Sequence, residues 1–205
     1  MIILQYLNNP VLLVIFLLGI GLAIGIHEAA HAWAAHKLGD STAKDMGRMS
    51  INPLTHVDPI GTLMFLLVGF GWGRPVPVDE RNLRRHSDVV WVALAGPASN
   101  LLAAIILGLF IRFQVVPAAN TVFALFTFLN LSLMTFNLIP IPPLDGSKIL
   151  RLFLSENAYY ALEQYSLILI LGLFFLLQFS AGAGNILVTI VTTIFSTITG
   201  SSLAF

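Results

Sequence analysis

The chain is 205 residues long, and its ten basic and ten acidic residues give a formal net charge of zero. Charged residues make up 10% of the sequence and hydrophobic residues 57%, whereas a soluble globular chain carries about 25% charged residues. This composition excludes an ordinary soluble domain and indicates a membrane protein. The neutral balance also excludes a nucleic-acid-binding surface. The absence of cysteine excludes disulfides and thiol nucleophiles.

Five apolar segments are each long enough for a helix to cross about 30 Å of hydrocarbon, which takes ~20 residues. They are residues 10–37, 89–113, 118–139, 158–179 and 184–203. These segments predict an all-α polytopic membrane protein with about five transmembrane helices. Polar residues within them, such as Thr127 and Asn130, are interpreted as packing residues between helices.

A sixth apolar run, residues 60–72, begins after Pro59 and ends before Gly73. A run of ~10–14 residues favours a re-entrant or interfacial segment over a span. If this run crossed the membrane, the basic clusters on its two sides would face opposite compartments, against the positive-inside rule. We therefore predict that the run dips into the membrane and returns. Both clusters then lie in the cytoplasm: Lys37, Lys44 and Arg48 before the run, and Arg74, Arg81, Arg84 and Arg85 after it.

The same reasoning extends to the rest of the chain. One basic residue, Arg112, closes the span 89–113, and Lys148 and Arg151 follow the span 118–139. We therefore expect the N-terminus outside, the C-terminus inside and five spans between them. The stretch 73–79, Gly-Arg-Pro-Val-Pro-Val-Asp, is extended or polyproline-like. It predicts either a short membrane-associated β-hairpin or a plain loop.

The first apolar segment ends in the sequence His27-Glu28-Ala29-Ala30-His31. Residues four apart share one face of a helix, so both imidazoles can bind one metal ion. Glu28 lies next to the first ligand, where it can reach a metal-bound water. Charged residues inside a membrane cost about 2.5–3.5 kcal/mol each on insertion scales, so these side chains need a compensating partner. The pattern predicts two zinc ligands and a general base.

A catalytic zinc site needs a third protein ligand and an open position for water. Asp145 follows three prolines at positions 140, 142 and 143, which force the preceding helix to end. Non-helical backbone at membrane depth survives only inside protein or beside water, so an aspartate here is favoured as a ligand. Its alternative role is the N-cap of a short helix over 146–154. Other candidates have ordinary roles at the surface or at helix ends: His36, His56, His86 and Asp58.

The expected topology brings the three favoured ligands to one depth in the membrane. The spans 10–37 and 118–139 both run from the outside to the inside. His27 and His31 lie near the inner end of the first span, and Asp145 lies just beyond the inner end of the second.

With these motifs in this order, the chain resembles the site-2 proteases, a family of intramembrane zinc metalloproteases. The resemblance covers the chain from the first span through Arg151. It implies one zinc ion per chain, bound by His27, His31 and Asp145, with Glu28 as general base. It rests on three stretches: His27-Glu28-Ala29-Ala30-His31, Gly96-Pro97-Ala98-Ser99-Asn100, and Asn137 through Asp145-Gly146.

The resemblance also implies that Asn100 and Asn137 bind and align the substrate peptide. From the residues alone, either asparagine serves equally well as an interhelical hydrogen bond. The stretch 73–79 resembles the membrane-associated hairpin that helps to present substrate in relatives. Pairing with such a strand edge would hold an unwound substrate extended.

The implied architecture is a single metalloprotease domain over residues 1–205. Its catalytic core occupies about residues 10–154, and two additional helices occupy residues 158–203. The chain departs from larger family members because the connection 112–119 is too short for a PDZ domain, and no C-terminal regulatory domain follows the last helix. The expected partners are the lipid bilayer and membrane-anchored proteins, cleaved within or near their transmembrane segments. The expected location is the cell membrane of a prokaryote, with the site toward the cytoplasm.

Two other functions would use parts of this pattern. A metal transporter could relay Zn²⁺ between histidine and aspartate at one depth, but it needs no general base beside a ligand. A catalytically inactive membrane scaffold could retain the fold, but the intact set of His27, Glu28, His31 and Asp145 argues against it. The sequence therefore favours a protease.

Overall fold

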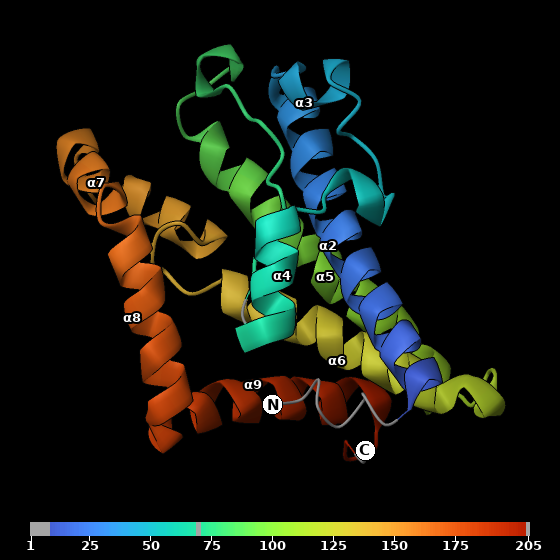
Figure 1. Cartoon of the computed structure of the whole chain (residues 1–205). Coiled ribbons are helices and arrows are strands. Elements are labelled where there is room, and N and C mark those ends of the chain that lie inside the picture. Colours follow the sequence, from blue (N-terminus) through green and yellow to red (C-terminus); the bar gives the residue numbers. More distant parts are fainter. Residues whose placement is uncertain (1–8, 69–70, 204–205) are drawn as a thin grey trace.

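The computed structural model describes residues 9–68 and 71–203, and this part of the chain is helical without any strand (Figure 1). Three long helices, α2 (Pro10–Leu38), α5 (Asp88–Arg112) and α6 (Asn120–Asn137), form the core, and each packs against the other two. A fourth, α9 (Ala181–Thr199), packs on α5 and α6. Short helices lie between them: α3 (Thr42–Asp45), η1 (Pro53–Thr55), α4 (Pro59–Val68), η2 (Glu80–Asn82), η3 (Pro117–Ala119) and η4 (Asp145–Leu152).

The ends of α2 follow from its sequence. The side chain of Asn9 accepts a hydrogen bond from the backbone N–H of Leu12 and caps the first turn. Gly39 ends the helix with a φ of 120°, a conformation that residues with a Cβ rarely adopt. The helix between them runs for 29 residues and carries the HExxH motif in its second half.

The chain between α2 and α5 runs back along the side of α2. A Cβ on Gly25 would lie 2.5 Å from the backbone oxygen of Ile51, so this loop touches the α2 backbone where only glycine fits. Further along, the ring of Phe65 in α4 stacks on Phe16 of α2, with centroids 6.2 Å apart. The loop and α4 therefore pass progressively from the middle of α2 toward its first turns.

The chain then returns to the place where α4 begins. The backbone N–H of Arg74 donates to the carbonyl of His56 at 2.7 Å. Gly61, near the start of α4, is in close contact with the backbone of Trp72. With ten residues, α4 is too short to cross a bilayer. Its two flanks meet at one end, as expected of a run that enters and returns.

The expected β-hairpin at 73–79 is absent from the described residues, where this stretch is extended but pairs with no strand. Pro75 and Pro77 lack the N–H group that a strand needs for pairing. The N–H between them, on Val76, donates to Glu28 at 2.8 Å. From Arg74 to Pro77, the backbone donors that would build a ladder are therefore missing or already used.

The extended segment, residues 73–79, is fixed to α2 and the loop that follows it. The guanidinium of Arg48 donates to the carbonyl of Arg74 at 2.7 Å. At the other end, the N–H of Asp79 donates to the carboxylate of Asp40 at 2.8 Å. Both anchors lie within ten residues of the end of α2 (Figure 1).

The expected span over 158–179 is broken. The structure has two helices there, α7 (Glu156–Glu163) and α8 (Ser166–Phe179), bent by 62° at the break. The carboxylate of Glu163 pairs with Lys148 at 3.1 Å. This ion pair holds the end of α7 against η4, so the polar end of α7 does not continue straight into the apolar α8.

The end of α9 also differs from the expected topology. Among the described residues, four helices are long and apolar enough to cross a membrane, or five if α7 and α8 count as one span. The guanidinium of Arg112, at the end of α5, donates to the carbonyl of Thr197 in α9 at 3.0 Å. The last turns of α9 thus lie beside the end of α5. The expected topology instead puts this part of the chain at the opposite end of the molecule, where α2 ends.

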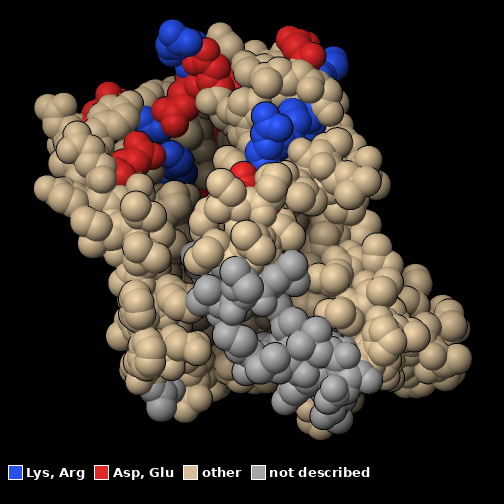
Figure 2. Space-filling view, viewed as in Figure 1, with Lys and Arg blue, Asp and Glu red and all other residues tan. Residues whose placement is uncertain are grey.

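Charged side chains gather at one end of the molecule. Figure 2 shows lysine, arginine, aspartate and glutamate at the end that carries α3 and α7, while the rest of that face is uncharged. This distribution agrees with the predicted clustering of the basic loops and with an apolar body that lies in the membrane.

Candidate metal centre

The three predicted ligands converge. His27 and His31 are both buried on one face of α2, one turn apart, with their Nε2 atoms 3.0 Å from each other. Asp145, the first residue of η4, places Oδ2 3.0 Å from Nε2 of His27 and 3.3 Å from Nε2 of His31. Residues 114 positions apart (145 − 31) thus offer three ligand atoms to one point.

The other ring nitrogens fix the tautomers of the two histidines. Nδ1 of His27 lies 2.6 Å from Oδ1 of Asn100, and Nδ1 of His31 lies 2.8 Å from the carbonyl oxygen of Val92. Both partners are acceptors, so each Nδ1 carries a proton and donates it. Each Nε2 is then left with a lone pair directed at Asp145.

This donor set fits a zinc ion. Oδ2 of Asp145 is buried and has no hydrogen-bond donor, and the two Nε2 atoms beside it carry no proton in these tautomers. Three lone pairs at such separations repel one another unless a cation lies between them. Zinc–ligand bonds of about 2.0–2.2 Å set the ligand atoms of a tetrahedral site about 3.3–3.6 Å apart. The separations here are close to that range. The set also matches the nitrogen and oxygen ligands that zinc prefers.

Asp145 is not a helix cap. Leu144 occupies the N-cap position of η4, and no side chain caps that helix. The backbone of Gly146 is in close contact with the carbonyl of Leu138, at the end of α6. This approach, which a side chain at position 146 would block, packs the start of η4 against α6 with the carboxylate of Asp145 toward α2.

Glu28 lines the same cavity as two of the predicted metal ligands. Its Oε2 accepts the N–H of Val76, and its side chain lines a cavity of about 300 Å³ together with His31 and Asp145. The remaining walls come from the extended segment, the start of α5 and two charged side chains: Pro75, Val76, Val78, Val89, Val92, Ala93, Glu80 and Lys148. The carboxylate of Glu28 and two of the three predicted metal ligands, His31 and Asp145, therefore face one cavity.

Gly96 is a site residue whose role the sequence does not reveal. A Cβ on this residue of α5 would collide with the ring of His31 and would lie 2.7 Å from Cε1 of His27. The sequence suggests only that a small residue here permits close helix packing. The structure shows that α5 is packed directly onto both imidazoles.

The two asparagines predicted to bind substrate lie in different surroundings. Asn100 is fully buried and faces His27, so the structure shows it as an interhelical hydrogen bond. Asn137 donates from Nδ2 to the carbonyl of Leu133 in its own helix at 2.9 Å, and it is not among the residues that line the cavity. Substrate binding by either asparagine stays a prediction.

The other candidate ligands lie away from the metal centre, although His56 is buried and not at the surface as expected. Asp58 caps α4 by accepting the N–H of Gly61 at 2.7 Å. The three remaining histidines hydrogen-bond or pair elsewhere: His36 with Ser41, His56 with the carbonyl of Ser50, and His86 with Glu156.

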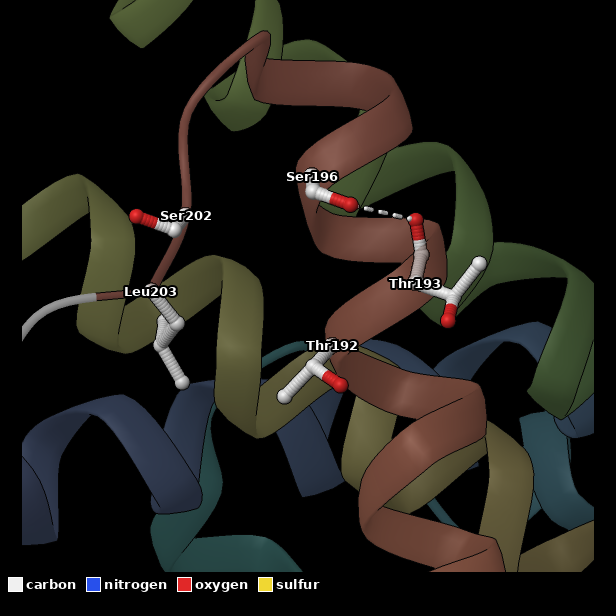
Figure 3. Close-up of a pocket in the computed structure, with 5 residues that line it drawn as sticks. All are labelled: Thr192, Thr193, Ser196, Ser202 and Leu203. Atoms are coloured by element: carbon white, nitrogen blue, oxygen red, sulfur yellow. Dashed lines mark hydrogen bonds between the residues drawn. The ribbon is translucent and has the colours of Figure 1, made fainter.

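A second hollow, also about 300 Å³, lies between α9 and the chain that follows it (Figure 3). Two of its hydroxyl groups bond to the backbone of α9: Ser196 donates to the carbonyl of Thr193, and Thr192 donates to that of Val188. It has no ionisable side chain and no part in the metal centre. The remaining lining residues are Ser202 and Leu203.

Several known proteins are similar in sequence to this chain. Residues 114–179 match the family model described as Peptidase family M50. The chain is 44% identical over 138 residues to "Putative zinc metalloprotease YwhC" of Bacillus subtilis, a match that covers 62% of this chain and 63% of YwhC. It is 33% identical over 152 residues to "Putative zinc metalloprotease Rip2" of Mycolicibacterium smegmatis, covering 69% and 58% of the two chains. No solved structure matches.

A third relative carries a different kind of name. The chain is 29% identical over 146 residues to "Stage IV sporulation protein FB" of Bacillus subtilis, covering 66% of this chain and 50% of that protein. The matches thus span between 50% and 63% of these relatives' own lengths. The family model covers the part of the chain that carries Asn137 and Asp145. Together these matches show a peptidase family M50 domain, the domain of the site-2 proteases, and relatives named as putative zinc metalloproteases.

Proposed function

We propose that this protein is an intramembrane zinc protease that hydrolyses peptide bonds within or near the transmembrane segments of membrane-anchored proteins. The observation that carries the proposal is the convergence of three unprotonated ligand atoms. Beside them, Glu28 lines a cavity together with two of the ligands, His31 and Asp145. The peptidase family M50 domain, the relatives named as putative zinc metalloproteases and four apolar helices of spanning length support it.

His27, His31 and Asp145 would hold one zinc ion, and three protein ligands leave a coordination position open. Zinc bound there would supply a Lewis acid for the scissile carbonyl and would lower the pKa of a bound water. The chain itself orients these ligands, because the Nδ1 proton of each histidine is committed to Asn100 or to Val92.

Glu28 would move the proton. Its carboxylate faces the cavity and accepts one hydrogen bond, from the N–H of Val76, which holds Oε2 in place. A carboxylate in this position can accept a proton from the attacking water and pass it to the leaving amine. Because two charged side chains, Glu80 and Lys148, also line the cavity, we expect water to reach it without crossing the apolar body.

Substitution of Glu28 by glutamine tests this assignment. The glutamine side chain has nearly the same shape but cannot accept the proton, so zinc content should match the wild type while cleavage falls by about 10²–10⁴-fold. The measurement compares membrane proteomes of cells that produce wild type or Glu28→Gln, together with metal analysis of both purified proteins. Single-span proteins should persist uncut only in cells with the variant.

A matched control and two contrary outcomes complete the test. Glu156→Gln, which alters an exposed glutamate of α7 that pairs with His86, should cleave like the wild type. Cleavage at the wild-type rate by zinc-loaded Glu28→Gln would sink the assignment of the general base. Zinc flux into liposomes that survives Glu28→Gln, with no cleavage by the wild type, would instead identify a transporter.

A further inference from the structure

A buried hydrogen-bonded relay connects α6 to the first metal ligand. Asn130 of α6 is 4% exposed, and its Oδ1 accepts a hydrogen bond from Nδ2 of Asn100 at 2.9 Å. Asn100 of α5 is 0% exposed, and its Oδ1 accepts the Nδ1 proton of His27 at 2.6 Å. The relay therefore crosses from α6 through α5 to α2, the three helices of the core.

Backbone carbonyls fix the direction of both amides. Nδ2 of Asn130 donates to the carbonyl of Phe126 at 2.8 Å, so its Oδ1 must point at Asn100. Nδ2 of Asn100 also donates to the carbonyl of Ala23 at 3.0 Å, so its Oδ1 must point at His27. A carbonyl oxygen can only accept, and neither amide can therefore reverse without losing a buried hydrogen bond.

The two histidines differ in what holds them. His31 donates to the backbone carbonyl of Val92, which no side-chain substitution removes. His27 donates to a side chain, and that side chain is oriented by a second one. A substitution of Asn130 can therefore remove a hydrogen bond that supports His27 without changing any of the metal ligands.

We propose that Asn130 is a positioning residue for the metal centre, acting through Asn100 to hold His27 as the Nδ1-protonated tautomer with Nε2 free. This inference rests on the proposed zinc site. Partners of ligating histidines fix ring orientation and tautomer, and their loss typically costs about 10–100-fold in metal affinity. From the sequence, Asn130 is only a polar packing residue.

The test measures zinc affinity of the full-length protein in detergent by competition with a chelating dye. Asn130→Leu removes the acceptor for Asn100 and should weaken zinc binding by about 10–100-fold. Asn130→Asp keeps an oxygen at that point and should bind zinc within about threefold of the wild type, a rescue that a purely structural role would not produce. The Co²⁺-substituted protein should show altered absorption bands only in the leucine variant.

Thr127 supplies the matched control. It lies on α6 one turn before Asn130, is 0% exposed, and its hydroxyl has no hydrogen-bond partner. Thr127→Val should leave both zinc affinity and the cobalt spectrum unchanged. If Asn130→Leu does not accumulate in membranes, Asn130→Ala compared with Thr127→Ala serves the same purpose.

The outcomes separate this inference from the proposed function. If the wild type binds no zinc, or His27→Ala binds it equally well, the proposed metal site is wrong. If the wild type binds zinc and His27→Ala does not, but folded Asn130→Leu binds it as tightly as the wild type, the relay has no positioning role. The same conclusion follows if Asn130→Asp is as weak as Asn130→Leu.

Discussion

At the scale of single residues, the tightest constraint on the metal centre is the contact between Gly96 and the two imidazoles. A methyl group at this position would overlap the ring of His31 and press on that of His27. Overpacking of this kind typically costs about 1–3 kcal/mol. We therefore expect Gly96→Ala to weaken zinc binding at least about fivefold, measured by chelator competition.

Gly172 is the control for this substitution. It lies on α8, and a Cβ added there meets no atom within 4 Å. Gly172→Ala should therefore keep wild-type zinc affinity, since alanine is also the better helix former. Wild-type zinc affinity in a folded Gly96→Ala protein would mean that the imidazoles are free to move, and that α5 does not define their positions.

The residues that converge at the metal centre differ in how far the sequence could predict them. His27 and His31 follow from local helix periodicity, and Asp145 from the local proline break. Gly96 and Asn130 could not be recognised in the same way. Their contacts depend on which faces of α5 and α6 meet α2, and several faces of these apolar helices are similar in composition.

At the scale of elements, the extended segment depends on the carboxylate of Asp40. This buried group accepts hydrogen bonds from the backbone and hydroxyl of Thr42, from Asn82 and from the N–H of Asp79. Burial alone would raise the pKa of Asp40, but the hydrogen bonds from Thr42 and Asn82 outweigh it, and the pKa lies below its ordinary value. The ionised form is therefore the one that the fold stabilises.

The lowered pKa of Asp40 sets how the stability of the fold depends on pH. A carboxyl group with a lowered pKa in the folded state stabilises the fold fully above its unfolded pKa, about 4, and this contribution is lost as the pH falls through the folded value. We expect Asp40→Ala to lower the free energy of unfolding by about 1–3 kcal/mol at pH ~7. The difference from the wild type should shrink below pH ~4, as measured by tryptophan fluorescence during denaturation in detergent.

Asp45, exposed on α3, is the matched aspartate. Asp45→Ala should change stability by less than about 0.5 kcal/mol. An Asp40→Ala protein that is as stable as the wild type at neutral pH would show that the extended segment is held without this anchor.

Hydropathy predicted the helices that are apolar along their whole length. It did not predict the bounds of segments that are polar at one end and apolar at the other. The helices α2, α5 and α6 lie close to their predicted ranges because a long apolar run can satisfy its backbone in a membrane only as a helix. The run 158–179 is apolar on average, but Glu163 near its start pairs with Lys148, and the helix breaks after it. The β-hairpin predicted over residues 73–79 does not form, because Pro75 and Pro77 lack the N–H donors that strand pairing needs.

At the scale of the whole molecule, charge patterning predicted the clustering of the basic loops, whereas the path of the last helix differs from the expected one. The basic clusters do lie together, at one end of an apolar body (Figure 2). Counting 158–179 as a full span sets the direction expected of α9. With α7 and α8 bent by 62°, the described residues hold four candidate spans, or five if this bent pair counts as one span, and the last turns of α9 lie beside Arg112.

Single cysteines can decide this topology, because the chain has no cysteine of its own. Lys44→Cys and Arg84→Cys, on either side of α4, should both react with a membrane-impermeant maleimide only after the cytoplasmic face is opened. Ala118→Cys and Ser201→Cys, at the end where α5 and α9 meet, should both react in intact cells. Labelling of positions 44 and 84 from opposite sides would mean that α4 crosses the membrane. Labelling of positions 118 and 201 from opposite sides would restore five spans and contradict the contact between Arg112 and α9.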